Sequence, residues 1–412
     1  MEIEYPRWQA HNIKQALQQS RIVAVSGSRQ SGKTTIARQV MNDNFIFRSL
    51  DRVELLQSAK NDPHEFVQHT GGTMIIDESQ KVPGLFSEIK LAVDSNNRAG
   101  QFLLTGSTNL YTTSKMGDSL AGRIRHIRLR PLTMGEILQR QPSFLQRAFS
   151  CSFPINIKGY DKEKIFDLAF NGGFPEIWRL ERQKAKREWH HAYMESILNK
   201  DLYEVEKIRR RDMMSDLVKI LAGWSGRYMD KAKIRQNLEI SKSTLDIYLN
   251  ALVSLYIFEY VPPWTRTDYE YVGRKAKIFA TDTGLMTTML NWQRDDVRLN
   301  ADRSGKLMET FVFQELSAQI NLDSDYTLYQ YRDMQKKEID FLVEKAGSNL
   351  LGIEVKASRT VSNADFQNLR WFKEKIAKDK INFMGLVLYS GEDTLSFGNN
   401  MLAVPIASLW DQ

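Results

Sequence analysis

A glycine-rich segment near the N-terminus constrains the fold of this chain more than any other feature. Residues 27–34 read Gly-Ser-Arg-Gln-Ser-Gly-Lys-Thr and fit the phosphate-binding pattern G-x-x-x-x-G-K-[ST] without a mismatch. The apolar run Arg21–Ser26 before this loop is typical of a buried strand, and Thr34–Val40 after it is typical of a helix. Strand, glycine loop and helix in this order predict a phosphate site in a parallel α/β sheet; the alternative is a chance match in a Gly-rich turn.

The residues of this loop have distinct expected roles toward ATP and Mg²⁺. Glycines let the backbone approach phosphate oxygens closely, and amides at the start of a helix attract negative charge. We expect Lys33 to reach the β- and γ-phosphates and the Thr34 hydroxyl to be a ligand of Mg²⁺. The whole expected nucleotide cradle comprises Gly27, Ser28, Arg29, Gln30, Ser31, Gly32, Lys33, Thr34 and Thr35.

A second apolar run ends in two acids and adds hydrolysis to phosphate binding. Residues 72–78 read Gly-Thr-Met-Ile-Ile-Asp-Glu. Asp77 is in position to hold magnesium, and Glu78 is in position to polarise the attacking water. Alone, this segment would be an ordinary strand that ends in solvated acids. Together with the upstream loop it favours an ATPase.

Two further segments carry candidates for contact with the γ-phosphate. A strand over residues 101–105 runs into a polar segment, in which Ser107 or Asn109 could sense this phosphate; a turn stabilised by such side chains is an equal alternative. Arg123 follows in a basic segment, where an arginine could stabilise the transferring phosphoryl group in cis or from a neighbouring subunit. A solvated basic strand is the alternative there.

These motifs make the chain resemble the bacterial and archaeal AAA-type ATPases that combine an N-terminal P-loop domain with a C-terminal domain long called uncharacterised. The resemblance spans nearly the whole chain in order. It implies that the strand ending in Asp77 lies apart from the strand before the phosphate loop. The matching pieces are residues 27–35, 75–78, 104–107, 120–123, 172–176, 277–279, 282–285, 338–340 and 353–356.

Composition narrows the class of protein. The chain has 412 residues, of which 42% are hydrophobic and 26% charged, and its net charge of +7 permits nucleic-acid binding without proving it. Its one cysteine, Cys151, excludes an intrachain disulfide framework and a cysteine zinc site. No apolar stretch approaches the length of a membrane span and no signal peptide is visible, so we expect a cytoplasmic protein that contacts no membrane.

The expected elements divide the chain into four parts. Residues 1–135 alternate strand and helix, as in a P-loop domain, and residues 136–212 read as a helical lid or linker. Residues 213–266 combine two short helices, a tight turn and a longer third helix, as in a winged helix-turn-helix. Residues 267–412 form the last part.

The third helix of the winged part carries a weak signature for DNA. We expect Ser241 or Ser243 to cap it, which places Lys242 and Thr244 near its start. Only one of these residues is basic and Asp246 follows, so duplex DNA binding and a purely structural packing role are equal alternatives. A basic cluster before this part is interpreted as a solvated face, with nucleic-acid contact as the lesser alternative; it consists of Lys207, Arg209, Arg210 and Arg211.

The last part carries a second candidate chemistry. Its expected order of helix, three strands, helix and strand is that of restriction-endonuclease-like cores. Side chains alternate along a strand, so Glu338 and Asp340 share one face, as do Glu354 and Lys356. Adjacent strands can therefore bring Asp340, Glu354 and Lys356 together in the D-x(n)-E-x-K pattern of nucleases. A surface hairpin with alternating charge is the alternative.

Each residue of this pattern has an expected role in phosphodiester cleavage. Asp340 and Glu354 would hold Mg²⁺ through hard oxygen ligands, and the metal would activate a water. Lys356 would orient this water or stabilise the transition state. By analogy only, Glu309 would be a further metal ligand and Gln367 would help to place the lysine.

The sequence therefore predicts an α/β protein with a P-loop NTPase sheet, a winged helix-turn-helix and a C-terminal nuclease-like domain. We expect an ATP-hydrolysing protein that acts on nucleic acid, DNA rather than RNA, with the ATP state controlling DNA binding or Mg²⁺-dependent cleavage. The alternative is a nucleotide-gated switch or scaffold that binds a protein partner and cuts nothing. A homo-oligomer is compatible with either hypothesis.

Overall fold

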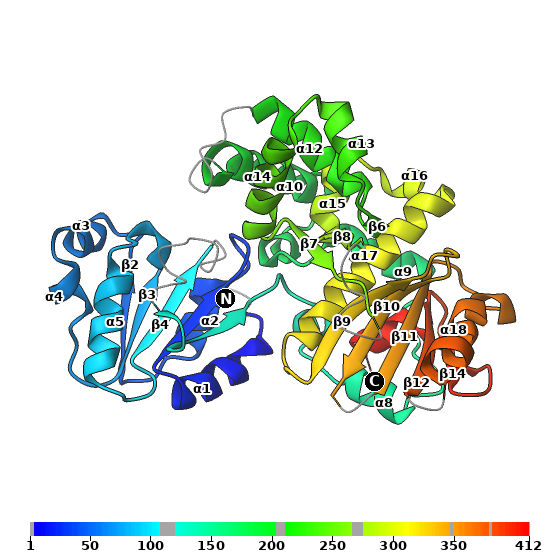
Figure 1. The fold of residues 1–412 in the computed structure, drawn as a ribbon, viewed down its shortest axis with the longest axis horizontal. Helices are drawn as coiled ribbons and strands as arrows, with labels where there is room; N and C mark the ends of the chain where they lie inside the picture. Colours follow the sequence, from blue (N-terminus) through cyan, green and yellow to red (C-terminus); the bar gives the residue numbers. More distant parts are fainter. Residues whose placement is uncertain are drawn as a thin grey trace. The chain divides into compact units, whose positions relative to one another are not determined.

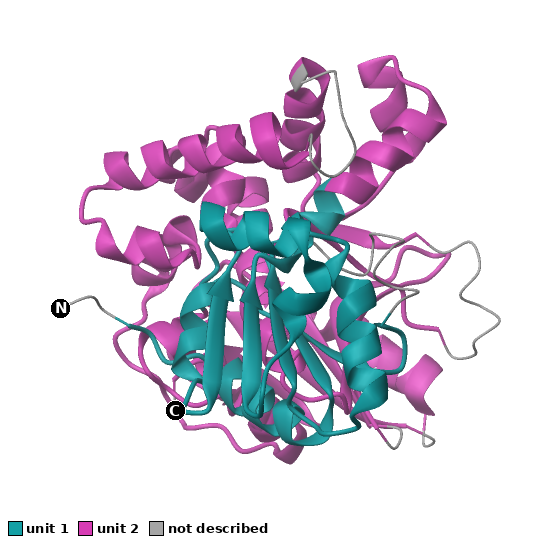
Figure 2. Ribbon diagram, turned by 90° about the vertical axis from the view of Figure 1, so that its left-hand side faces the viewer, with its two compact units in different colours: residues 1–132, 252–256 teal, residues 133–251, 257–412 magenta. Residues whose placement is uncertain are grey.

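The computed structural model describes residues 4–107, 120–202, 211–265, 275–346, 349–378 and 381–411 (Figure 1). Contacts divide the chain into two compact units (Figure 2). Unit 1 comprises residues 1–132 and 252–256, and unit 2 comprises residues 133–251 and 257–412. The end of unit 1 lies close to the boundary predicted at residue 135. The finer boundaries predicted within unit 2 stay predictions.

Unit 1 is built on a five-stranded parallel sheet in the order β2-β3-β4-β1-β5 (Figure 1). The strands are β1 (Ile22–Ser26), β2 (Phe45–Ser49), β3 (Thr73–Asp77), β4 (Phe102–Gly106) and β5 (Ile124–Arg128). Strand β4 lies between β1 and β3, so the strand that ends in Asp77 lies apart from the strand before the phosphate loop. This order, implied by the resemblance, is confirmed.

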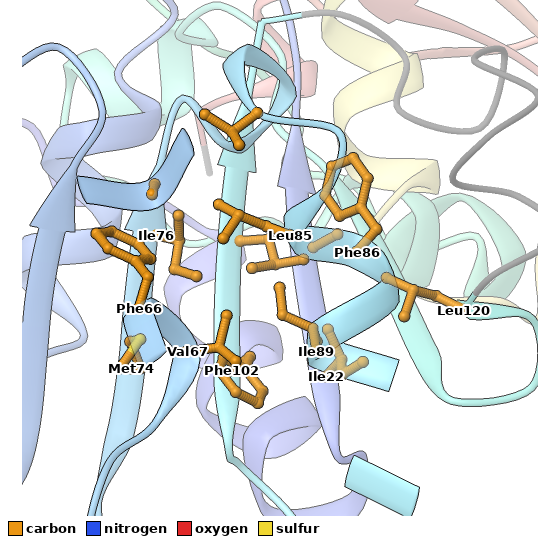
Figure 3. Packing of buried hydrophobic residues seen from close by; sticks show 14 of the residues in the cluster. Ile22, Phe66, Val67, Met74, Ile76, Leu85, Phe86, Ile89, Phe102 and Leu120 are labelled. Atoms are coloured by element: carbon orange, nitrogen blue, oxygen red, sulfur yellow. The ribbon is translucent and has the colours of Figure 1, made fainter. Parts of the chain in front are cut away.

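Helices cover both faces of this sheet, and its three central strands, β3, β4 and β1, are buried along their whole length. In β1, Ile22 and Ala24 belong to one apolar cluster, shown in Figure 3, and Val23 and Val25 belong to another. The first cluster includes side chains from α3 (Val53–Asn61), α4 (Pro63–Val67) and α5 (Leu85–Ser95). The second includes side chains from α1 (Gln9–Gln19) and α2 (Lys33–Gln39). The loop after β1 therefore starts from a fully buried strand.

Unit 2 begins with helices and continues with a small antiparallel sheet in the order β6-β8-β7. The side-chain oxygen of Ser241 accepts a hydrogen bond from the Thr244 amide at 3.0 Å, so Ser241 is the residue that caps the third helix. These elements are α7 (Met134–Ile137), α8 (Phe144–Ser150), α9 (Lys162–Asn171), α10 (Gln183–Ser196), α12 (Arg211–Gly223), β6 (Arg227–Tyr228), α13 (Lys231–Leu238), α14 (Lys242–Ser254), β7 (Phe258–Val261) and β8 (Lys277–Ala280). The last residues of α14, from Leu252 on, are assigned to unit 1.

The remaining part of unit 2 holds a six-stranded mixed sheet in the order β13-β14-β12-β11-β10-β9. Strands β9, β10 and β11 are antiparallel neighbours, whereas β11 pairs with β12 in parallel. The expected order of helix, three strands, helix and strand is present; β13 and β14 were not expected. The elements are α15 (Thr283–Met289), α16 (Arg294–Leu299), α17 (Ala301–Ile320), β9 (Tyr326–Arg332), β10 (Glu338–Lys345), β11 (Asn349–Lys356), α18 (Gln367–Phe372), β12 (Asn382–Tyr389), β13 (Leu395–Ser396) and β14 (Met401–Pro405).

Two of the motifs that carry the resemblance meet in the interior of unit 2. The buried carboxylate of Asp282 caps α15 by accepting from the Leu285 amide at 2.8 Å, and it accepts from the Gly173 amide at 2.6 Å. Gly172 has a φ of +68°, and a Cβ there would lie 2.4 Å from the Asp282 carboxylate. The Asp282 carboxylate therefore holds the Gly172–Gly173 turn against the start of α15, and we interpret this contact as structural.

In the described ranges, no helix is both long and apolar enough to cross a bilayer. The basic cluster lies almost wholly outside these ranges, since residues 203–210 are not described. Its predicted contact with solvent or nucleic acid stays a prediction.

A buried acid of α17 fixes the start of unit 2. Both carboxylate oxygens of Glu315 accept a hydrogen bond from the Met134 amide, at 3.0 and 3.1 Å. Glu315 is fully buried, and this burial raises its pKa to about 8 despite the hydrogen bond from Met134. The protonated acid is therefore favoured in the folded protein relative to the unfolded chain.

We expect Glu315 to make folding weaken with rising pH. Its contribution is fully present below about pH 4.5, the ordinary glutamate pKa, and is lost as pH rises to about 8, by roughly a few kcal/mol. Glu315→Gln keeps an oxygen acceptor but does not titrate, so thermal midpoints measured from pH 5 to 8 should fall less steeply than in the wild type. The same change at exposed Glu195 of α10 is the control; equal slopes for the wild type and Glu315→Gln would contradict the assignment.

Candidate functional site

The phosphate loop of unit 1 closes tightly on its own backbone. The buried Lys33 ammonium donates to the carbonyls of Gly27 at 3.1 Å and Ser28 at 2.8 Å. A Cβ at Gly27 would lie 2.0 Å from the Leu129 carbonyl oxygen, so no side chain fits there. Gly32 has a φ of +96°, a conformation that favours glycine. The glycines of the motif are thus required by the local geometry.

The interior of this loop fits a phosphate group. The hydroxyls of Ser28 and Ser31 are buried and have no hydrogen-bond partner among the described residues. Buried hydroxyls without a partner are costly, and here they line a loop that precedes the N-terminus of α2. Arg29, Gln30 and Thr35 are more exposed, and their predicted contacts with the nucleotide stay predictions.

An arginine before α1 supports the loop from outside. The Arg7 guanidinium donates to the carbonyl of Ser31 at 2.7 Å and to the carbonyl of Arg130 at 2.6 Å. Arg7 therefore ties the phosphate loop to the chain that follows β5. Sequence reasoning missed this residue, and no motif around it gives a signal.

The Asp77 carboxylate is the centre of a hydroxyl cluster at the carboxyl ends of the strands. Thr34 Oγ1 lies 3.1 Å from each of its oxygens, and Ser49 Oγ lies 3.3 Å from Oδ2. The Thr105 hydroxyl also donates to Asp77. Thr34 and Asp77, predicted as magnesium ligands, are brought together, and a carboxylate beside a hydroxyl is an oxygen donor set that Mg²⁺ accepts. Sequence reasoning missed Thr105 and Ser49, although Thr105 lies at the expected end of its strand.

The neighbouring acid, Glu78, is held by two polar side chains. Its backbone has a φ of +56°, which is uncommon for glutamate. Its carboxylate accepts from Gln80 Nε2 at 2.5 Å and lies 3.5 Å from Ser107 Oγ, and Gln80 also donates to Ser107 at 3.1 Å. Ser107 therefore contacts the predicted base. Its sensing of the γ-phosphate stays a prediction, and Asn109 lies outside the described residues.

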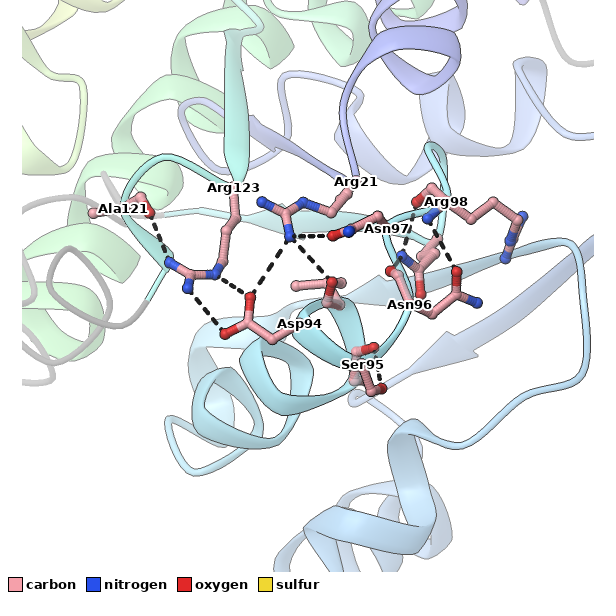
Figure 4. Close-up of polar contacts among 11 residues, drawn as sticks. Arg21, Asp94, Ser95, Asn96, Asn97, Arg98, Ala121 and Arg123 are labelled. Carbon is pink, nitrogen blue, oxygen red and sulfur yellow. Dashed lines mark hydrogen bonds and ion pairs between the residues drawn. The ribbon is translucent and has the colours of Figure 1, made fainter.

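Arg123 lies at the wrong end of the sheet for a contact with the nucleotide of its own chain. It precedes β5, whose first residue pairs with Ile22, whereas Ser26 before the phosphate loop pairs with Arg128. The strand between them spans roughly 15 Å. The guanidinium instead binds Asp94 at 2.6 and 2.9 Å and donates to the Ala121 carbonyl at 3.0 Å (Figure 4).

Of the two alternatives left open for Arg123, this position disfavours a role in cis. The hydrogen bond from Arg123 lowers the pKa of Asp94. Arg21 adds a further positive charge 3.6 Å from Asp94, so the group is arranged as a structural ion pair. A role from a neighbouring subunit stays a prediction. The expected strand bounds already contained this information, because an arginine that begins a parallel strand lies at the edge opposite to the phosphate loop.

A second polar cluster surrounds a buried ammonium in unit 2. Lys277 of β8 is 1% exposed. Its Nζ lies 2.9 Å from Glu309 Oε1, 2.7 Å from Glu338 Oε1 and 3.5 Å from Asp340 Oδ1. Glu338 and Asp340 therefore share one face of β10, as predicted. The sequence analysis included Lys277 only in the matching segment 277–279 and predicted no partner for it, since a lysine in an apolar strand indicates no specific partner.

The other residues of the predicted nuclease pattern lie on the adjacent strand. β10 and β11 pair with Phe341 opposite Ile353, and Asp340 Oδ2 accepts from the Val355 amide at 2.9 Å. Lys356 Nζ lies 3.8 Å from Glu354 Oε2. A hydrogen bond from Asn368 reaches Glu354, so the neighbour of the predicted Gln367 contacts this site.

The pKa values in this cluster are shifted because several buried acids share few positively charged side chains. Burial raises the pKa of Glu309 to about 8, although Lys277 acts against the rise. Burial, and then the charge of Asp340, raises the pKa of Glu354 well above its ordinary value. Burial alone would lower the pKa of Lys277, but the surrounding carboxylates raise it, so the ammonium stays charged.

The predicted metal set is only partly assembled. Among the described residues, no group of three or more acidic, histidine or cysteine side chains has the arrangement of a metal site. Glu309, predicted as a further metal ligand, contacts Lys277 instead. The metal roles of Asp340 and Glu354 therefore stay predictions.

Comparison with known families assigns the N-terminal part. Residues 19–138 match a family described as "AAA domain". This part is an AAA-type P-loop ATPase domain. Residues 162–296 and 304–409 match families described as domains of unknown function, DUF8612 and DUF4143. The family matches thus support the nucleotide site and leave the chemistry of unit 2 open.

Relatives that match along most of this chain are known only as uncharacterized proteins. Rv2008c of Mycobacterium tuberculosis is 26% identical over 401 residues, which cover 96% of this chain and 82% of the relative. MJ1544 of Methanocaldococcus jannaschii is 22% identical over 390 residues, which cover 90% of this chain and 83% of the relative.

Solved structures give weak matches. The RuvB Holliday junction branch migration motor of Thermotoga maritima has 16% identity and a TM-score of 0.29, over 65% of this chain and 95% of that chain. A STAND protein of Pyrococcus horikoshii with a tetratricopeptide repeat sensor has 12% identity and a TM-score of 0.21, over 77% of this chain and 47% of that chain. At these TM-scores neither neighbour says anything about the function of this chain.

We expect Thr105→Val to lower kcat for ATP by roughly 10- to 100-fold. Valine fills the same buried space but cannot donate to Asp77 or accept from the Glu78 amide. Steady-state phosphate release, with ATP binding measured separately, checks this. Thr73→Val is the matched control, because the Thr73 hydroxyl bonds to the Gly100 carbonyl at the other end of β3. Equal kcat in the wild type and Thr105→Val would contradict the role.

Proposed function

We propose that this protein hydrolyses ATP in unit 1 and uses the nucleotide state as a switch for unit 2. The observation that carries the proposal is the convergence of Thr34, Asp77 and Glu78 beside the phosphate loop. Lys33 and the amides of the loop would bind the phosphates, and Thr34 with Asp77 would hold Mg²⁺. The metal would supply charge neutralisation at the β- and γ-phosphates.

Glu78 is the proposed general base for the attacking water. The contacts of Gln80 and Ser107 both go to Oε2 of its carboxylate, so Oε1 can accept a proton from the attacking water while these two side chains orient the group. The polar pair therefore supports a base that is oriented before the nucleotide is hydrolysed.

We expect Lys33→Ala to lower ATP turnover by about 100-fold or more, since the variant loses the ammonium aimed into the loop. Phosphate release under saturating ATP measures this. Lys60→Ala on the exposed side of α3 is the control and should hydrolyse ATP like the wild type. Normal turnover in Lys33→Ala would refute the assignment of the loop.

A second candidate function is ATP-controlled binding and cleavage of nucleic acid by unit 2. The order α12, β6, α13, α14, β7, β8 with the sheet order β6-β8-β7 supports a winged helix-turn-helix. The order α17, β9, β10, β11, α18, β12 supports a nuclease-like core. Against DNA contact by the third helix, its Asp246 binds Lys231 at 2.7 Å and so reduces the positive charge at this surface.

Cleavage depends on Asp340 in this second candidate. We expect Asp340→Asn to abolish any cutting of supercoiled plasmid, single-stranded DNA or RNA in Mg²⁺ or Mn²⁺ without unfolding the protein. Parallel reactions with and without ATP, and with Lys33→Ala, show whether the nucleotide licenses cutting. Unchanged cutting in Asp340→Asn would locate the activity elsewhere. ATP hydrolysis without cutting of any nucleic acid would instead support a nucleotide switch that acts on a protein partner.

A further inference from the structure

We propose that Lys277 is a built-in cation that closes the carboxylate cluster of unit 2 to divalent metal ions. The cluster would then bind a metal only after this ammonium has left it. The choice of a divalent ion rests on the second candidate function. The blocking role of Lys277 does not require that nucleic acid is cleaved.

The position of the ammonium carries the inference. Three carboxylates from two elements converge on one nitrogen: Glu309 comes from α17, and Glu338 and Asp340 come from β10. The lysine comes from β8, which belongs to the separate three-stranded sheet. The acids of one sheet and its neighbouring helix therefore receive their counter-ion from another sheet.

The Lys277 ammonium occupies the place in which these carboxylates would coordinate a divalent ion. Carboxylate oxygens are the ligands that Mg²⁺ and Mn²⁺ prefer, and an ammonium within 2.7–3.5 Å of three of them competes for the same oxygens. A dication a few ångströms away would also be repelled strongly, even at the effective dielectric constant of a protein interior. The ammonium and a metal thus exclude each other.

A second observation indicates that this cluster has an unfilled place for a positively charged group. Glu354 is 6% exposed, and its Oε1 atom is buried without a hydrogen-bond partner in the part of the chain that the structure describes. Glu354 follows Ile353, which pairs with Phe341, so Glu354 lies across from Asp340 on the adjacent strand and belongs to the same cluster. A buried carboxylate oxygen without a partner is costly, and a cation coordinated by Glu354 and Asp340 would satisfy it.

Backbone geometry holds the ammonium and its partner in place. In the small sheet, Lys277 pairs with Tyr228 of β6 and with Val261 of β7, and its Nζ lies 5.6 Å from the centre of the Tyr228 ring. A Cβ on Gly226 would lie 2.8 Å from a Glu309 carboxylate oxygen. Release of the ammonium therefore requires either a new side-chain conformation or a shift of β8.

The test measures Mn²⁺ binding by the full chain without nucleotide. Binding is monitored as the loss of the electron paramagnetic resonance signal of free Mn²⁺. We expect Lys277→Met to bind Mn²⁺ at least about tenfold more tightly than the wild type. The added Asp340→Asn change should remove the gained site. This second change separates the cluster from any weak binding at Thr34 and Asp77.

Lys345→Met is the matched control. Lys345 is on β10, the strand of Glu338 and Asp340, but its Nζ lies over the rings of Tyr326 and Phe149, at 5.6 and 5.7 Å. This variant loses the same charge from the protein, so it should bind Mn²⁺ like the wild type. Equal affinity in Lys277→Met and Lys345→Met would overturn the proposal.

If Lys277→Met does not fold, the proposal can still be tested with the wild-type protein. Mn²⁺ binding to the wild type should not change on Asp340→Asn, and an Asp340-dependent site in the wild type would overturn the blocking role. Failure of the nuclease candidate gives a different result. In that case no nucleic acid is cut, while Lys277→Met still gains the Asp340-dependent Mn²⁺ site.

Discussion

The Asp77 carboxylate organises the nucleotide side of this protein. Thr34, Ser49 and Thr105, from α2, β2 and β4, all place hydroxyls on it. This convergence depends on the sheet order, because β4 between β1 and β3 brings its polar carboxyl end beside the acid. With β3 directly beside β1, the Thr105 hydroxyl would have no place between the phosphate loop and the acid. The strand order thus places a carboxylate with three hydroxyls beside the phosphate loop.

Much of this arrangement could be predicted from the sequence, because it follows from local pattern. Apolar runs that end in Ser26, Asp77 and Thr105 fix three strands, and polar residues at their carboxyl ends meet at one edge of a parallel sheet. Arg123 stands before its strand, so its position at the opposite edge of the sheet follows from the same rule, while its role from a neighbouring subunit stays a prediction. Arg7 could not be predicted, since it acts through carbonyl groups that any sequence provides.

In unit 2 the sequence predicted faces of strands but not the partner across them. Alternation correctly placed Glu338 and Asp340 together, since a period of two residues decides the face. The position of Lys277 depends instead on how the small sheet packs against α17 and β10, and this long-range contact leaves no local pattern. The motifs around Gly172 and Asp282 are visible in the sequence, but their residues form a buried structural contact and lie in no proposed site.

The two units solve the same electrostatic problem in different ways. In unit 1, hydroxyl donors surround Asp77, and these leave a carboxylate free to accept a metal ion that arrives with the nucleotide. In unit 2, a lysine of the chain itself satisfies the acids, and removal of a buried counter-ion is costly unless another cation replaces it. Metal chemistry in unit 2 therefore needs a conformational step that unit 1 does not need. In the proposed function, ATP hydrolysis would supply the free energy for such a step, which would give the proposed switch and the proposed blocked cluster a common physical basis.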